Sequence, residues 1–114
     1  MVCPGRGFVL GVSLALLFAG CGSKSPTKEQ YLENGDKYAS EKKFSEALIE
    51  YLNAVKVDDK FGPAHAKLSQ TYIELNQKNR ALTEGVRAAD LMAEDDNVQL
   101  NVARMLLLAG KLTG

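Results

Sequence analysis

The feature that most constrains this chain is an internal repeat with a period of 34 residues. When residues 28–61 are written above residues 62–95, Tyr38 falls on Tyr72 and Ala47 falls on Ala81. The other aligned pairs are Ala54 with Ala88, Val57 with Leu91, Gly35 with Ser69, Phe44 with Lys78, and Tyr31 with His65. A fixed period of this length with helical patterning indicates a stack of helix-turn-helix units.

The patterning within each unit is helical. Tyr31, Leu32, Gly35 and Tyr38 recur at spacings of three and four residues, which predicts a first helix with one packed face. Thr27 with Gln30 forms a capping box at its start. A second helix follows, with a broad apolar stripe between positions 44 and 55. The third and fourth helices repeat this arrangement in the next unit.

Polar residues, Gly and Pro separate the expected helices. Asp58-Asp59-Lys60 breaks the chain, and Gly62-Pro63 starts the third helix with Pro in the first turn. Asn76-Gln77 turns the chain before the fourth helix, and residues 94–97 break it again. A fifth helix is expected from Val98 to Ala109, stopped by Gly110. Because no segment alternates like a strand, the sequence predicts an all-α fold.

These residues resemble the tetratricopeptide repeat family over residues 28–114. The first unit, 28–61, carries the family's large, small and aromatic positions at Tyr31, Gly35, Tyr38, Ala47, Tyr51 and Ala54, with Asp59 where Pro is usual. The second unit, 62–95, carries them at His65, Leu68, Ser69, Tyr72, Ala81 and Ala88, and departs at Gly85 and Ala93. The start of a third, at 96–114, shows Val102, Ala103 and Leu106. The resemblance implies a right-handed α-solenoid, with a thinner place in the packing at Gly85.

The first 20 residues have the composition of a secretory signal peptide. A short start with Arg6 precedes the apolar run Phe8 to Ala19, and small residues follow. The run is shorter than the ~20 residues of a comfortable transmembrane helix. Leu17-Phe18-Ala19-Gly20-Cys21 resembles the bacterial lipobox, although Phe18 stands where Leu is commonest.

The lipobox resemblance implies that Cys21 is the first residue of the mature chain and carries a diacylglycerol, with an acyl chain such as palmitate on its amine. Residues 22–27 then read as a flexible tether, because they are small, polar and contain Pro. Gly22, rather than Asp, follows Cys21, which by analogy favours the outer membrane and the periplasmic side. The alternative is an incidental cysteine beside an ordinary cleavage site or in a membrane helix.

Composition argues against several other functions. The formal net charge is zero, so there is no basic excess to neutralise the phosphates of nucleic acid. Both cysteines, Cys3 and Cys21, lie at the start, which leaves no disulfide or cysteine metal site for the body. The single histidine, His65, aligns with Tyr31 and reads as a packing residue. The sequence therefore predicts no catalytic, cofactor or metal site and no enzyme.

Binding is the activity that the resemblance implies. In this family the first helix of each pair lines a concave groove for a protein or peptide partner. The groove positions here are Leu32, Asp36 and Ala39, then Lys67, Gln70 and Glu74, then Asn101, Arg104 and Leu108. Leu32 and Asp36 replace the Lys and Asn of the clamp that holds a terminal carboxylate in some family members. A simple solvated face is the alternative for each residue.

The combined expectation is a membrane-anchored interaction scaffold in the bacterial cell envelope. The opening after Cys21 resembles that of repeat lipoproteins associated with exopolysaccharide export and the exosortase (PEP-CTERM) sorting system. Pilus-assembly and outer-membrane assembly lipoproteins share this layout and remain alternatives, as does the repeat segment of a larger envelope enzyme. Because residues 112–114 fall where another helix is due, a truncated array or self-association through an uncapped C-terminal end is also expected.

Overall fold

The computed structural model describes residues 24–113, and it confirms an all-α fold for this part of the chain. The five helices there are α2 (Lys28–Ser40), α3 (Phe44–Val57), α4 (Gly62–Glu74), α5 (Lys78–Leu91) and α6 (Asp96–Thr113). No strand occurs between residues 24 and 113. The signal peptide and Cys21 lie outside the described residues.

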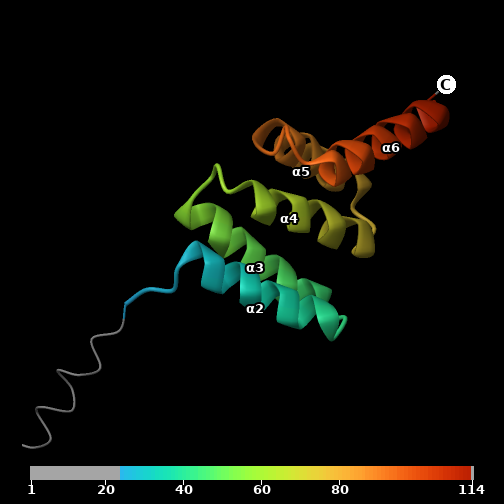
Figure 1. Ribbon diagram of the computed structural model, residues 1–114. Helices are drawn as coiled ribbons and strands as arrows, with labels where there is room; N and C mark the ends of the chain where they lie inside the picture. Colours follow the sequence, from blue (N-terminus) through green and yellow to red (C-terminus); the bar gives the residue numbers. More distant parts are fainter. Residues whose placement is uncertain (1–23, 114) are drawn as a thin grey trace, which may run out of the picture.

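The helices form consecutive hairpins that stack in chain order (Figure 1). α2 packs against α3, and α4 packs against α5, while α3 also meets α4 to join the two hairpins. α6 packs on α5 and continues the row. The bounds of α4 and α5 are those of α2 and α3 shifted by 34 positions, and α6 begins 34 positions after α4. The structure therefore repeats the period of the sequence.

Side chains satisfy free backbone N–H groups at the starts of α2 and α6, and α4 starts with Pro in its first turn. The predicted capping box of α2 is confirmed: Thr27 Oγ1 accepts from Gln30 N at 3.2 Å, and Gln30 Oε1 accepts from Thr27 N at 2.8 Å. Pro63 occupies the first turn of α4 as predicted. Asp95 caps α6, since its Oδ1 accepts from Asn97 N at 3.0 Å and from Val98 N at 3.2 Å.

The turn inside each hairpin has the same geometry. Lys42 adopts φ 61° and Asn76, 34 positions later, adopts φ 59°. The following residues close the turn, with Lys43 N donating to Tyr38 O at 2.9 Å and Gln77 N donating to Tyr72 O at 2.8 Å. This left-handed residue ends the first helix and reverses the chain so that the second helix can pack back on it.

The core combines small residues at close helix approaches with a few large ones. Ala47 and Ala54 in α3, and their equivalents Ala81 and Ala88 in α5, are fully buried. Tyr51 and Leu68 are the largest fully buried side chains, each 1% exposed. Alanine at the contact points lets the helices approach, and the large side chains fill the gaps between them.

Two predicted boundaries of the last helix are wrong. α6 begins at Asp96 rather than Val98, because Asp95 caps it two residues earlier than the apolar pattern starts. It also runs through Gly110 to Thr113 instead of stopping. Glycine stops a helix when it adopts a left-handed conformation, and no glycine in the described residues has a positive φ. Within a helix, glycine costs only about 1 kcal/mol against alanine.

Candidate protein-binding groove

The first helices of the hairpins contribute side chains to two neighbouring hollows. The first hollow, of about 430 Å³, lies between α2 and α4 and has part of α3 in its wall. It brings together Asp36, Lys67, Gln70 and Glu74 from the predicted groove, along with Ala39. Phe44 and Tyr51 of α3 also line it.

The first hollow is polar and internally paired. Lys67 Nζ lies 3.1 Å from Asp36 Oδ1, which links α4 to α2 across the space. The Tyr51 hydroxyl donates to the same Asp36 oxygen at 2.6 Å. Burial, and then this hydrogen bond, raise the pKa of Tyr51 well above its usual value, so the phenol stays neutral and keeps donating. A ligand here would have to compete for groups that already have partners.

The second hollow, of about 330 Å³, lies between α4 and α6 and reaches α5. It contains the remaining polar groove positions, Asn101 and Arg104, and shares Gln70 with the first hollow. Six of its lining residues are repeat equivalents of residues in the first hollow: Gln70 of Asp36, Ile73 of Ala39, Gly85 of Tyr51, Asn101 of Lys67, Arg104 of Gln70, and Met105 of Thr71. The two hollows are thus repeat-related positions on one surface.

The two apolar groove positions at the ends lie elsewhere. Leu32 is half-buried and packs against the core, and it lines neither hollow. Leu108 is 62% exposed on α6 and is also outside both. The predicted groove positions that line the two hollows therefore extend from Asp36 and Ala39 through Gln70 to Arg104.

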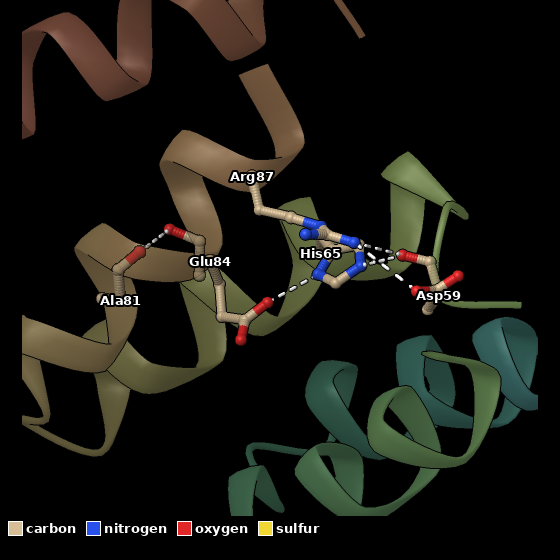
Figure 2. A network of polar contacts seen from close by, with 6 residues as sticks. Asp59, His65, Ala81, Glu84 and Arg87 are labelled. Atoms are coloured by element: carbon tan, nitrogen blue, oxygen red, sulfur yellow. Dashed lines mark hydrogen bonds and ion pairs between the residues drawn. The ribbon is translucent and has the colours of Figure 1, made fainter. Parts of the chain in front are cut away.

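His65 belongs to a buried polar network on the other side of α4 (Figure 2). The side chain is 5% exposed, its Nδ1 lies 2.6 Å from Glu84 Oε2, and its Nε2 lies 2.8 Å from Asp59 O. Arg87 reaches the same Asp59 with its guanidinium, at 3.6 Å from the carboxylate. The two ring nitrogens thus contact a carboxylate of α5 and a backbone carbonyl of the loop before α4. The network ties the loop before α4 to α5, whereas the sequence indicated only a packing residue at His65.

Between residues 24 and 113, no cluster of three or more His, Cys, Asp or Glu side chains is arranged to hold a metal ion. No helix in this same range is both long and apolar enough to cross a membrane.

The apolar wall of the second hollow was not predicted from the sequence. Ser69, Val102 and Met105 line it together with Gly85, but only Gly85 had been singled out as a thin place in the packing. The signal that could have found them is the register itself, which places Gly85 where the first unit has the Tyr51 ring.

Comparison with known proteins adds no identity: no protein-family model matches this chain, and no curated protein matches it.

Proposed function

We propose that this chain is a membrane-anchored scaffold of the bacterial envelope, whose tetratricopeptide-like solenoid binds a protein or peptide partner. The observation that carries the proposal is the pair of repeat-related hollows on α2, α4 and α6. A surface formed at the same place in successive units suits an extended ligand that crosses several helices. The proposal assigns the chain a binding role without a catalytic step.

The anchor in this proposal is the lipid on Cys21, with residues 1–20 as the removed signal. Residues 24–27 are exposed and precede the first helix, which supports a tether between lipid and repeats. Two or three acyl chains on Cys21 would hold the chain firmly, since each buried CH₂ contributes about 0.8 kcal/mol. The envelope location, with the outer membrane and a role in exopolysaccharide export or protein sorting, rests on the resemblance of the opening.

The groove is tested by site-specific photo-crosslinking in the native host. A photoreactive residue at Gln70, which is exposed and lines both hollows, is expected to give a discrete protein adduct. The matched control is Asp90, exposed on α5 and outside both hollows. The captured protein is then purified and titrated against the chain and its Asp36→Lys variant. Equal adducts from Gln70 and Asp90, or no adduct from Gln70, would contradict the groove as the binding surface.

The anchor is tested by the intact mass of the protein extracted from host membranes. Lipidation predicts a mass that begins at Cys21 and includes a diacylglycerol and an acyl chain. The Cys21→Ala variant is expected to lose both the lipid mass and the membrane fraction. An unmodified cysteine in the wild type contradicts the anchor and leaves the groove proposal untouched.

Self-association is a second candidate, favoured by the exposed face of α6. Leu100, Leu106 and Leu107 are 51%, 50% and 67% exposed. They are two repeats after Leu32, Tyr38 and Ala39, which pack against the core in α2. The α6 helix of a second copy would cover this apolar face.

Light scattering over a range of concentrations tests this candidate. The Leu106→Lys/Leu107→Lys variant is expected to be monomeric where the wild type is dimeric. Ile49→Lys, at a residue that is 57% exposed on α3, is the control and is expected to leave the dimer intact. A wild type that stays monomeric at every concentration contradicts self-association.

A further inference from the structure

The space beside Gly85 is best understood from its counterpart in the first unit. There the buried Tyr51 ring lies directly against Gly35: a Cβ atom at Gly35 would be 2.6 Å from Tyr51 Cδ1 and 2.9 Å from Cζ. The ring fills the space between α2 and α3, and its hydroxyl is held by Asp36. A missing side chain at one position and an aromatic ring at the other are therefore complementary.

In the second unit smaller side chains stand at the position of the ring. Gly85 stands at the Tyr51 position, and Ser69 stands at the Gly35 position. Ser69 Oγ donates to Ala81 O at 2.7 Å, so its hydroxyl is committed to the backbone of α5. Val102 and Met105 of α6 approach from the other side, with Val102 Cγ2 3.3 Å and Met105 Sδ 3.6 Å from a Cβ built on Gly85. An open hollow of about 330 Å³ remains between these side chains.

The side chains that line this hollow favour an aromatic side chain as its occupant. Its deep wall is apolar, with Ala88 fully buried and Val102 only 7% exposed. The Met105 sulfur makes favourable contacts with aromatic ring edges. The volume is at the lower end of the range for ligand pockets, about 300–1,000 Å³, which suits one side chain better than a whole cofactor.

The rim adds a charge preference. Arg104 is the only charged side chain among the residues that line the hollow, and it is exposed. It makes no ion pair with any residue in the described part of the chain, whereas Lys67 in the first hollow is paired with Asp36. A free guanidinium beside an apolar cavity favours a carboxylate next to the inserted side chain.

We propose that the hollow lined by Ser69, Gly85, Val102 and Met105, here named the aromatic socket, accepts one Phe or Tyr side chain of the partner, with an acidic residue beside it on Arg104. This inference rests on the proposed groove and specifies what the partner must carry. The inserted ring lies in the hollow beside Gly85, next to the place that the chain's own Tyr51 occupies in the first unit. A tyrosine ring would also meet Gln70, the equivalent of Asp36.

The test is a peptide titration followed by NMR of the methionine methyl groups in the full chain, held in detergent micelles. The probe is a seven-residue glycine-serine peptide with one phenylalanine followed by one aspartate. Met105 lines the socket, and Met92 packs against Gly62 at the end of α5, so the second methyl is an internal reference. The expected result is a saturable ring-current shift of the Met105 methyl with little change at Met92.

Probe variants separate the two features of the ligand. Replacing the phenylalanine of the peptide by alanine is expected to abolish the Met105 shift. Replacing the aspartate by asparagine is expected to weaken binding roughly two- to fivefold, as for an exposed ion pair. The Arg104→Gln variant should remove this difference between the two peptides and leave the phenylalanine-dependent shift in place.

Protein variants test the site itself. The Ser69→Gly/Gly85→Tyr variant rebuilds the Gly35–Tyr51 pair in the second unit and fills the socket, so the Met105 shift should disappear. The equivalent of Val102 in the first unit is Leu68, which is larger and is accommodated beside Tyr51, so the new ring has room. Ala66→Leu is the second variant. It introduces the residue type of the equivalent position in the first unit, Leu32, and narrows the hollow without altering its deep wall.

The proposal is overturned if the peptide moves Met92 as much as Met105, or if the shift persists in both protein variants. It is also overturned if no shift appears in the wild type up to about 100 mM peptide, because burial of one aromatic side chain contributes about 1.5–3 kcal/mol and predicts a Kd of about 6–80 mM. Crosslinking from Gln70 distinguishes failure of the aromatic socket from failure of the whole groove. If the partner adduct survives in Ser69→Gly/Gly85→Tyr with unchanged affinity, the socket fails and the groove stands; if no adduct forms in the wild type, the groove itself fails.

Discussion

The first and second hairpins have the same backbone arrangement but different side chains between their helices. Their helices begin and end at equivalent residues, and their turns share one left-handed position. In the first hairpin the Tyr51 ring packs against Gly35 and lines a polar hollow, whereas Gly85 stands at the Tyr51 position in the second, where the hollow has an apolar wall. The buried alanines and the turn are the same in both hairpins, so the large residue between them can differ without a change in the backbone.

The ends of the two hairpins also differ in the contact that joins their helices. In the first, Lys28 Nζ lies 2.6 Å from Asp58 Oδ2 and joins the start of α2 to the end of α3. The equivalent residues in the second are Gly62 and Met92, and a Cβ at Gly62 would be 2.5 Å from Met92 Cγ. One hairpin is joined at this end by an ion pair and the other by a close apolar contact, so changes of pH and salt should act on them differently.

The largest expected effect comes from removing the ring that distinguishes the first hairpin. Tyr51→Ala opens a cavity and leaves Asp36 without its hydroxyl donor, and we expect a loss of about 3–5 kcal/mol in the free energy of unfolding. Tyr51→Phe keeps the ring and is expected to lose about 1 kcal/mol for the hydrogen bond. Urea unfolding measures both. A loss below 1 kcal/mol for Tyr51→Ala would mean that the two hairpins are equally open.

The small residue opposite the ring should be sensitive only in the first hairpin. Gly35→Ala places a Cβ against the Tyr51 ring, where overpacking costs about 1–3 kcal/mol and exceeds the gain in helix propensity. Gly85→Ala meets Ser69 Oγ at 3.0 Å and Val102 Cγ2 at 3.3 Å, which are wider contacts than those at Gly35, and is expected to change stability by less than about 1 kcal/mol. Equal losses in thermal unfolding would contradict the difference in packing.

The turn that the two hairpins share allows a comparison in which the expected effect is smaller and is a gain in stability. Lys42 holds a left-handed conformation that costs a residue with a Cβ about 1–2 kcal/mol, so Lys42→Gly should stabilise the chain by up to about 1 kcal/mol. Asn76→Gly should gain less, because asparagine tolerates this conformation better. The melting temperatures of the two variants should therefore differ in this order, and a loss at Lys42 would contradict the turn geometry.

The smallest expected effect is the pH dependence of the ion pair. The hydrogen bond from Lys28, followed by that from Lys60 N, holds the pKa of Asp58 below its usual value of 3.8. The same pairing raises the pKa of Lys28 above 10.5. Asp58 thus contributes stability above pH 3.8 that is lost as pH falls through its lowered pKa, and the Lys28 contribution is lost as pH rises through its raised pKa.

Asp58→Asn is therefore expected to cost a little stability near neutral pH and nothing at the acid end. Met92→Leu at the equivalent place is the control, and its effect should not depend on pH between these limits. Urea unfolding at a series of pH values measures both. If the free energies of unfolding of Asp58→Asn and the wild type differ by the same amount at every pH, the ion pair does not contribute to stability.

Much of the fold was predictable because it depends on local signals. The capping box at Thr27, Pro63 in the first turn of α4 and the turn at Asn76 each depend on residue types with a strong backbone preference. The left-handed Lys42 carries no such signal in its side chain, and only its alignment with Asn76 indicates it. The end of α6 was wrong because glycine was taken as a stop where the helix continues.

The candidate site was less predictable because it depends on distances between helices. The spacing of Asp36 and Lys67 placed both on first helices, but not within 3.1 Å of each other. The hydrogen bond from Tyr51 to Asp36 joins residues on different helices and has no sequence pattern. Likewise His65 was expected to pack, whereas its bonds to Glu84 and Asp59 follow only from the way α5 and the α3–α4 loop lie against α4. The lipid on Cys21 stays a prediction.

The end-to-end order of the helices has a consequence for how the molecule opens. α4 is held on one side by α3 and on the other by α5, whereas α6 is held chiefly by α5. In such a one-dimensional array, local opening begins at the member with the fewest neighbours. Amide hydrogens should therefore exchange fastest in α6 and slowest in α4. Since α6 provides one wall of the second hollow, ligand binding there should slow exchange of α6 more than that of any other helix.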